Sequence, residues 1–293
     1  HCPQCHYTAH NRVFPDPLKH AYIEKGLVGR RLAEIRKNDP AMVRITETLA
    51  AGTAFEKTDF VQAIRLSLLE IYFQRVIIGL LNQSHELLAR SLLRLAWLFR
   101  DWHEMQPDRA DSEQRLASVL DAIAPDWPDC PRSETDALEA ACKWFGIALE
   151  RTSKAQDAVE TCGMMVQVAR IRVKMGDLAL ASTQLGECQR SIIHELDIGT
   201  RSMNDDLRKH NLSEEERGRM LTDSRKLAAL LEECRKRKTA VDRSRAKTLV
   251  AAHPKVASVA LRKLLEQAEI SADIIREFVP DRKEGLFGGL FSS

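Results

Sequence analysis

Apolar residues recur every three or four positions from residue 58 onward, which is the period of an amphipathic helix. Phe60, Ile64 and Leu68 start this pattern, and Thr58 can cap its first turn. A second helix is expected over residues 85–102. Its apolar positions are Leu88, Leu92, Leu95, Ala96 and Phe99. No strand pattern is visible, so the sequence predicts an all-α fold.

Pairs of helices are expected in the middle of the chain. A short helix over 112–124 precedes a proline-bounded loop at 125–131, which is the clearest internal boundary. Helices are expected over 134–152 and 155–174, and a tight glycine turn leads into another over 177–195. Small residues at three- and four-residue steps let such helices approach closely. This is the packing logic of tetratricopeptide repeats, so the sequence predicts a tetratricopeptide-like helix-pair superhelix.

A long charged hairpin is expected after the helix pairs. Ser213 and Glu216 form a capping-box pattern, and residues 214–250 contain no proline. They should therefore form one long helix, which His253-Pro254 stops. Residues 255–278 carry the apolar positions of a returning helix, and partly coiled-coil packing is expected between the two.

The chain therefore divides into four predicted segments. A head region covers residues 1–52, a helix-pair domain 53–199 and the helical hairpin 200–280. The tail over 281–293 contains the segment LFGGLF, which is apolar but too rich in glycine for a stable helix. Two interpretations of the tail stay open. It is either a frayed terminus or a short peptide that docks on a protein or contacts a membrane surface.

Composition narrows the class of protein. With 44% hydrophobic and 29% charged residues, the 293-residue chain is typical of a globular protein, and a net charge of +2 gives no global attraction to nucleic acid or anionic lipid. The apolar run at 76–81 is far shorter than the ~20 residues that span a bilayer. Cys142, Cys162, Cys188 and Cys234 lie in helical apolar patterns, which predicts buried thiols in a reducing compartment and hence a cytoplasmic location.

The sharpest candidate chemistry lies at the start of the chain. Cys2 and Cys5 form a Cys-x-x-Cys pair, which can place two thiolates on one zinc ion. Two sulfurs are half of a tetrahedral site, and further ligands could come from His1, His6, His10 or His20. The predicted site is structural rather than catalytic. A redox pair would need a βαβ unit, which the pattern does not show, and unused thiols are the remaining interpretation.

No enzyme is predicted, and no catalytic or cofactor-binding residues are assigned. Three His-Glu dipeptides, at 85–86, 103–104 and 194–195, lack the second His that a zinc protease helix carries four residues after the first. Nucleotide-binding glycine loops and the serine nucleophile elbow are also absent from the sequence.

Two further features have a binding and a structural interpretation. Residues 235–238, Arg-Lys-Arg-Lys, could meet phosphates, but acidic residues interleave with them, so a solvated helix face is the favoured interpretation. Trp97 and Trp144 fall within apolar helical patterns and are expected in the core. Trp127 lies between two prolines and is the expected exposed anchor for a partner.

A cysteine motif at 2–9 (CPQCHYTA), a helix around 60–69 and the distinctive segment LLRLAWLFR at 92–100 occur together in this chain. In this combination the chain resembles a bacterial family catalogued as domain of unknown function 2225. The resemblance covers residues 1–195. It implies a cysteine-knuckle head followed by tetratricopeptide-like helices, and it implies no activity.

The favoured hypothesis is a non-enzymatic scaffold or adaptor of a bacterial cell. It would bind segments of partner proteins in a helix-pair groove within residues 58–199. Self-association through the C-terminal hairpin is a further expectation. The alternative is binding of nucleic acid or an anionic membrane surface through the basic hairpin and the zinc head, with nucleic acid the less favoured partner.

Overall fold

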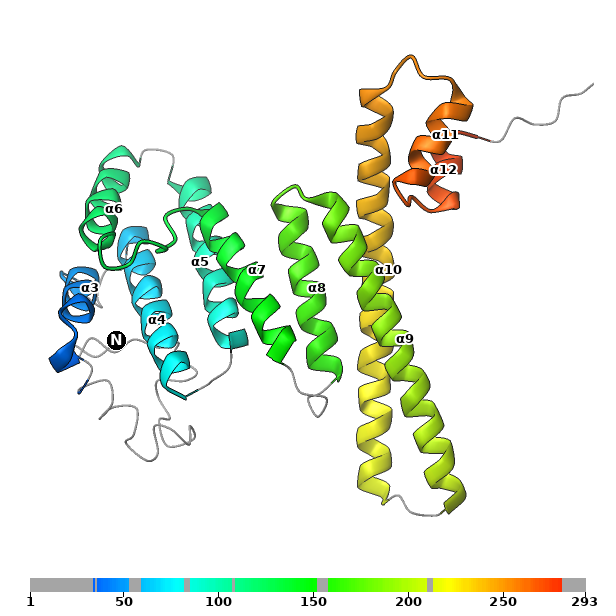
Figure 1. Ribbon diagram of the computed structural model, residues 1–293, viewed down its shortest axis with the longest axis horizontal. Coiled ribbons are helices and arrows are strands. Elements are labelled where there is room, and N and C mark those ends of the chain that lie inside the picture. The colour runs from blue at the N-terminus through cyan, green and yellow to red at the C-terminus, as the bar shows by residue number, and fades with distance from the viewer. Residues whose placement is uncertain are drawn as a thin grey trace, which may run out of the picture. The chain divides into compact units, whose positions relative to one another are not determined.

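The computed structural model describes residues 34, 36–52, 59–81, 85–106, 109–151, 158–209 and 213–280. Within these ranges all regular structure is helical, which confirms the predicted all-α class. The chain divides into two compact units, unit 1 up to Arg151 and unit 2 from Thr152 onward (Figure 1). None of the described helices is both long enough and apolar enough to cross a bilayer.

Unit 1 contains helices α3 to α7. Their bounds are α3 Pro40–Ala50, α4 Phe60–Leu81, α5 His85–Met105, α6 Ala110–Ile123 and α7 Glu134–Arg151. Helix α5 packs on both α4 and α7, while α3 and α6 pack on α4 and on each other. Successive long helices are therefore neighbours in space, as short connections favour.

Asp39 and Arg65 satisfy the two ends of α3. The Asp39 carboxylate accepts hydrogen bonds of 2.9 and 3.1 Å from two backbone N–H groups of the first turn. At the other end, the Arg65 guanidinium of α4 donates to the carbonyl oxygens of Thr48 and Leu49 at 2.9 and 3.1 Å. These groups have no partner inside the helix, and a cation complements the negative end of its dipole.

The core of unit 1 is centred on α5. Its predicted apolar positions are all buried: Leu88, Leu92, Leu95, Ala96 and Phe99. The buried side chains of α7 are Ala137, Leu138, Ala141, Cys142, Phe145 and Ala148. Alanines at three of these six positions keep α7 thin on this side, which lets the two helices pack closely, as the sequence pattern indicated.

Unit 2 contains helices α8 to α12. Their bounds are α8 Ala158–Lys174, α9 Leu178–Lys209, α10 Glu214–Ala252, α11 Ser258–Gln267 and α12 Ala272–Phe278. Helix α8 ends in the predicted glycine turn, where Gly176 has φ +81° and the Asp177 N–H donates to the Arg172 carbonyl at 2.9 Å. This bond satisfies an end carbonyl of α8 and reverses the chain into α9.

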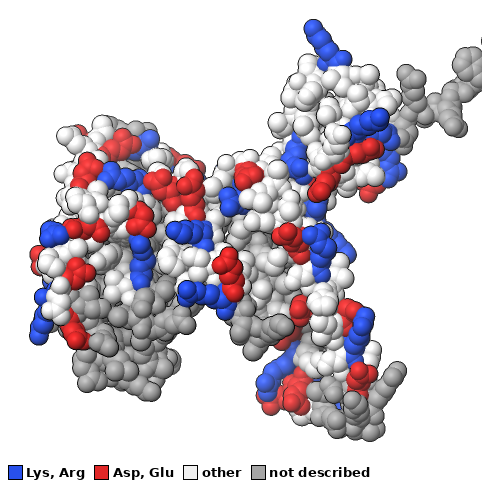
Figure 2. All heavy atoms as spheres, in the orientation of Figure 1, with Lys and Arg blue, Asp and Glu red and all other residues white. Residues whose placement is uncertain are grey.

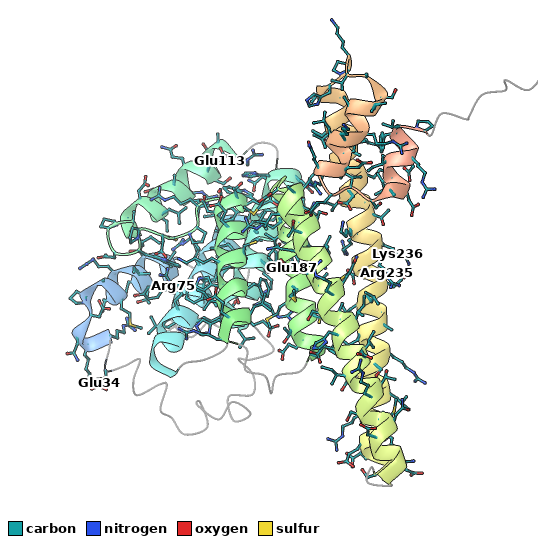
Figure 3. The ribbon with its side chains drawn as sticks, turned by 45° about the vertical axis from the view of Figure 1, so that its right-hand side comes forward. Glu34, Arg75, Glu113, Glu187, Arg235 and Lys236 are labelled. Carbon is teal, nitrogen blue, oxygen red and sulfur yellow. The ribbon has the colours of Figure 1, made fainter. Side chains whose placement is uncertain are left out.

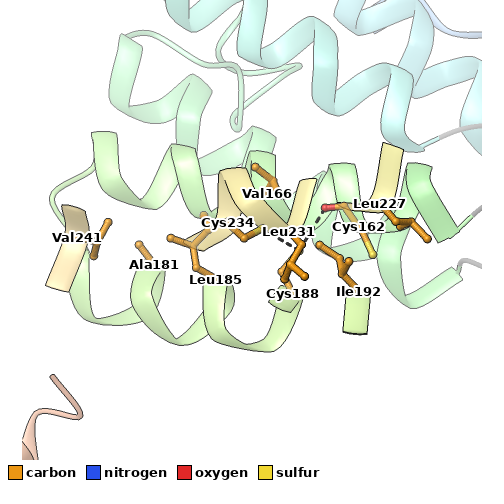
Figure 4. Packing of buried hydrophobic residues seen from close by; sticks show 11 residues of the cluster. Cys162, Val166, Ala181, Leu185, Cys188, Ile192, Leu227, Leu231, Cys234 and Val241 are labelled. Carbon is orange, nitrogen blue, oxygen red and sulfur yellow. Dashed lines mark hydrogen bonds between the residues drawn. The ribbon is translucent and has the colours of Figure 1, made fainter. Parts of the chain in front are cut away.

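Two hydrophobic clusters hold unit 2 together. The larger one joins α8, α9 and α10 (Figure 4). Its buried members are Cys162, Val166, Ala169, Ala181, Leu185, Cys188, Ile192, Leu227, Leu231, Cys234 and Val241. The smaller one joins the last turns of α10 to α11, α12 and the turn between them, and its buried members are Ala246, Leu265, Ile270, Ile274, Ile275 and Val279.

The hairpin differs from the predicted one. The helix expected over 177–195 continues to Lys209, and α9 is the main antiparallel partner of α10. The returning helix expected over 255–278 is instead two short helices, separated by a turn in which Glu269 has φ 56°. The predicted capping box of Ser213 and Glu216 is confirmed. The tail over 281–293 and most of the predicted head lie outside the described residues.

Candidate functional site

The predicted zinc ligands Cys2 and Cys5 lie outside the described residues, as do His1, His6, His10 and His20. Among the residues that the structure does describe, no three His, Cys, Asp or Glu side chains converge in a way that could hold a metal ion. Structural zinc in the head therefore stays a prediction.

Helix α5 presents large side chains on the side opposite its buried stripe. Leu87, Trp97 and Met105 are 44%, 46% and 73% exposed. Arg90 and Arg94 fall on the same side, because these five residues recur near multiples of the helical turn. We call Leu87, Arg90, Arg94, Trp97 and Met105 the α5 face. Tryptophan and arginine are the residues most enriched at the energetic centres of protein interfaces.

Arg94 of the α5 face is held by a polar network between α4 and α5. Its guanidinium donates to the Ser91 hydroxyl at 2.7 Å and to the Glu70 carboxylate at 3.2 Å. Gln74 donates to the same two groups at 3.0 Å each. Glu70 and Ser91 are almost fully buried, whereas the Arg94 side chain is 40% exposed. The network therefore holds the guanidinium in one position at the surface.

The tryptophans are distributed differently from the prediction. Trp97 is about half exposed rather than in the core, and Trp127 is 3% exposed rather than an anchor at the surface. The helical phase explains Trp97, because it lies half a turn away from Leu95 and Phe99 and cannot share their buried side. That signal was present in the sequence.

Trp127 is instead the centre of a buried aromatic cluster. Its ring lies 5.3 Å from that of Tyr72, and the Arg75 guanidinium sits over it at 5.5 Å from the ring centroid. Arg75 also pairs with Asp129 at 3.0 Å, which ties α4 to the loop after α6. Burial raises the pKa of Tyr72 to about 12. The prolines therefore place Trp127 under a loop, as a packing residue.

An open groove of about 580 Å³ lies between α4 and α6 of unit 1. Its lining residues are Val61, Arg65, Asp111, Gln114, Arg115, Ser118 and Val119. Both of its arginines already have partners, since Arg65 donates to the end of α3 and Arg115 pairs with Asp59 at 3.3 Å. The described lining of the groove therefore offers no unpaired arginine that could bind an anion.

The basic run at 235–238 lies on α10, where Figure 3 shows Arg235 and Lys236 next to each other. Lys236 lies 3.6 Å from Glu232, and Arg237 pairs with Glu233 at 2.7 Å. Figure 2 shows acidic and basic side chains interspersed on the visible face of the molecule. Local pairing of this kind weakens attraction to phosphates, as the interleaved acidic residues indicated.

Ser182, Lys238 and Asp242 form a buried polar cluster between α9 and α10. The Ser182 hydroxyl donates to the Asp242 carboxylate at 2.6 Å, and Lys238 Nζ donates to Ser182 Oγ at 3.2 Å. A serine beside a lysine resembles a nucleophile and its base, but this lysine is ion-paired with Asp242 and Ser182 is 3% exposed. The cluster therefore joins two helices. Sequence patterns did not reveal it, because Ser182 lies 60 residues from Asp242 and 56 from Lys238.

Three cysteines meet inside unit 2. The Cys234 and Cys188 sulfurs are 3.6 Å apart, and the Cys188 thiol lies 3.6 Å from the Cys162 carbonyl oxygen. Hydrogen bonding to Cys162 and Cys234, with burial, raises the pKa of Cys188. The predicted burial of the Cys142, Cys162, Cys188 and Cys234 thiols is confirmed, and Cys130 is buried as well.

Comparison with protein families gives one match, and it assigns the chain to a family. Residues 1–194 match the family described as "Uncharacterized protein conserved in bacteria (DUF2225)". Comparisons with curated proteins and with solved structures gave no match. The matched range is more than half of the 293 residues, includes the whole α5 face, and ends within α9. The chain therefore belongs to the DUF2225 family of bacterial proteins, as its cysteine motif and its LLRLAWLFR segment indicated.

Proposed function

We propose that this protein is a non-enzymatic scaffold or adaptor that holds a segment of a partner protein on the α5 face of unit 1. One observation carries the proposal: Trp97 is 46% exposed on the side of α5 opposite its buried stripe, where Leu87 and Met105 are exposed as well. Keeping a large aromatic ring in water forgoes the free energy of its burial, and a partner that covers the ring recovers it.

The chemistry around Trp97 favours a protein partner over a small molecule. Leu87 and Met105 extend the apolar surface along more than two turns on either side of Trp97, which suits a helical or extended segment. Arg94 offers fixed N–H groups to that segment's carbonyls or carboxylates. The tetratricopeptide-like stacking of unit 1 and a structural zinc ion in the head belong to the same proposal, as parts that support this surface.

The alternative, binding of nucleic acid or an anionic membrane through α10, has less support. Lys236 and Arg237 already lie against Glu232 and Glu233. A surface that binds phosphates through its cations loses affinity steeply as salt rises. Partner binding on the α5 face should depend much more weakly on salt, because its centre is apolar.

A photo-reactive phenylalanine at position 97 tests the proposal. In the native bacterium, ultraviolet light should link the full chain to one partner in stoichiometric yield. An affinity-tagged chain should recover the same partner, and Trp97→Glu should lose it at least about tenfold, as expected for an interface centre. Val259→Glu is the matched control, since it places the same charge on a 72% exposed apolar residue of unit 2.

Two results would overturn the proposal. One is a chain that forms no adduct at position 97 and recovers no stoichiometric partner. The other is a partner that Trp97→Glu and Val259→Glu retain equally, because binding would then take place on another surface.

A further inference from the structure

Helices α9 and α10 continue beyond α8 as a two-helix arm with little core of its own. Among the residues whose burial is described, the last buried residue on α9 is Ile192 and the first on α10 is Leu227. Between them Ile193, Ile198 and Leu221 are 51%, 46% and 45% exposed. Two helices alone shield few side chains, and packing rather than propensity supplies most helix stability. The arm therefore leaves apolar side chains exposed that a further helix could cover.

Helix α10 carries a second stripe, separate from the one that packs on α9. Glu214, Leu221, Ala228 and Arg235 are seven residues apart and all exposed. The α9-facing stripe consists of other residues, including Leu227, Leu231 and Cys234. Seven-residue spacing brings these four side chains to nearly the same side of the helix, with the apolar Leu221 and Ala228 in the middle and one charge at each end.

The charges on this part of α10 change sign along its length. Residues 214–223 contain four acidic and two basic side chains, whereas residues 225–238 contain six basic and two acidic ones. Within the described part of the chain, Glu214 and Arg235 have no ion-pair partner, although Glu215 pairs with Arg219. The two ends of the second stripe thus carry opposite charges, and no described residue of the same unit forms an ion pair with either of them.

We propose that two copies of this chain pair antiparallel along the second stripe of α10, about a two-fold axis between Ser224 and Arg225. This arrangement places Glu214 of one copy opposite Arg235 of the second copy, at both ends of the contact. Leu221 lies opposite Ala228 in the same way, so a large side chain meets a small one. A parallel pairing would instead place Glu214 beside Glu214, which like-charge repulsion disfavours.

The same geometry accounts for two further residues. Arg217 of one copy lies opposite Glu232 of the second, which adds a contact between opposite charges at each end of the pairing. Arg225 lies beside the axis and therefore close to Arg225 of the second copy. Repulsion between these two like charges makes it the least favourable position of the pairing. The contact from Glu214 to Arg235 spans about 32 Å at 1.5 Å per residue, and its mixed character suits a dimer of micromolar affinity.

Charge reversal followed by mixing tests the arrangement in the full chain. Sedimentation equilibrium should find the native chain at twice its mass of 33.2 kDa at ~100 µM. Glu214→Arg and Arg235→Glu should each weaken the dimer at least about tenfold, because each creates two like-charge contacts. Mixed in equal amounts, the two variants should form a heterodimer close to native affinity, because every contact between them is again of opposite charge.

Matched controls separate pairing from folding. Glu215→Arg and Lys236→Glu make the same charge changes one position off the stripe, and both should leave the dimer intact. Arg225→Leu should tighten it, since it removes the like charges beside the axis. The proposal is overturned if the native chain is monomeric at ~100 µM, if the off-stripe variants weaken the dimer equally, or if mixing fails to produce the heterodimer. None of these readouts depends on the α5 face.

Discussion

The Ser182 hydroxyl of α9 and the Asp242 carboxylate of α10 are joined by a hydrogen bond of 2.6 Å, and both side chains are at least 97% buried. Lys238 and Arg245 approach the same carboxylate from neighbouring turns of α10. A buried carboxylate is costly unless it is paired, so these contacts fix the register between the two helices.

Asp242→Ala should therefore destabilise unit 2. It removes the acceptor of Ser182 and leaves two cations beside an apolar core, at a cost of about 2 to 3 kcal/mol, less than for a fully enclosed pair because Lys238 keeps some access to water. Urea unfolding followed by circular dichroism measures this loss. The control Asp223→Ala breaks only the exposed pair with Lys226 and should cost less than about 0.5 kcal/mol. Equal losses in the two variants would contradict a structural role for Asp242.

Truncation should cost much more stability at one aromatic residue of unit 1 than at another. Phe145 is fully buried on α7, so Phe145→Ala should cost about 3 to 5 kcal/mol through lost burial and the cavity left behind. Trp97→Ala should cost about 1 kcal/mol or less, since half of that side chain is already in water. Thermal unfolding compares the two variants. A larger loss at Trp97 would place it in the core and remove the basis of the α5 face.

Two glycines of unit 2 should show effects of opposite sign for one chemical change. Gly176 has φ +81°, and no atom lies within 4 Å of the position that a Cβ would take, so Gly176→Ala should destabilise by about 1 kcal/mol through backbone strain alone. Gly163 lies inside α8 with the same free space. Gly163→Ala should stabilise by about 0.5 to 1 kcal/mol. Equilibrium unfolding in urea measures both, and a Gly176→Ala variant that is as stable as the native chain or more stable would contradict the assigned turn.

Tyr72 should make the stability of unit 1 sensitive to alkaline pH. Its pKa is raised to about 12 by burial, so the folded state keeps the phenol proton over a range in which the unfolded chain releases it. Stability should therefore be intact below the ordinary tyrosine pKa near 10 and fall as pH rises toward 12.

Absorbance at the tyrosinate band, compared between the native chain and Tyr72→Phe, reports this titration. One phenol should ionise late in the native chain, and the late step should disappear in Tyr72→Phe. If Tyr72→Phe removes absorbance from the ordinary step near pH 10 instead of a late step, Tyr72 is open to solvent.

Local pattern was enough to predict much of the helical content. The buried stripe of α5 and the capping box of α10 follow from residue spacing, because both depend on neighbours within one or two turns. The exposed position of Trp97 could also have been derived from helical phase. The apolar character of the segment alone does not indicate it, because buried and exposed positions of one helix are distinguished by their phase.

Tertiary pairing was much less accessible. Nothing near Ser182 in the sequence indicates that its partner is Asp242, and the long reach of α9 was hidden by Gly199 and by the polar residues after it. The break between α11 and α12 involves neither proline nor glycine; Glu269 adopts a positive φ that the smaller cluster of unit 2 stabilises. Such features depend on contacts between segments, which spacing within one segment does not record.

Helix α10 runs through both hydrophobic clusters of unit 2, contributing Val241 to one and Ala246 to the other. The clusters share no buried side chain, so their separation is set by the unbroken ladder of hydrogen bonds along this single helix. Helix α10 is thus a continuous rigid element that sets the spacing of the two clusters. The distance between the two clusters can therefore change only if this helix bends or breaks.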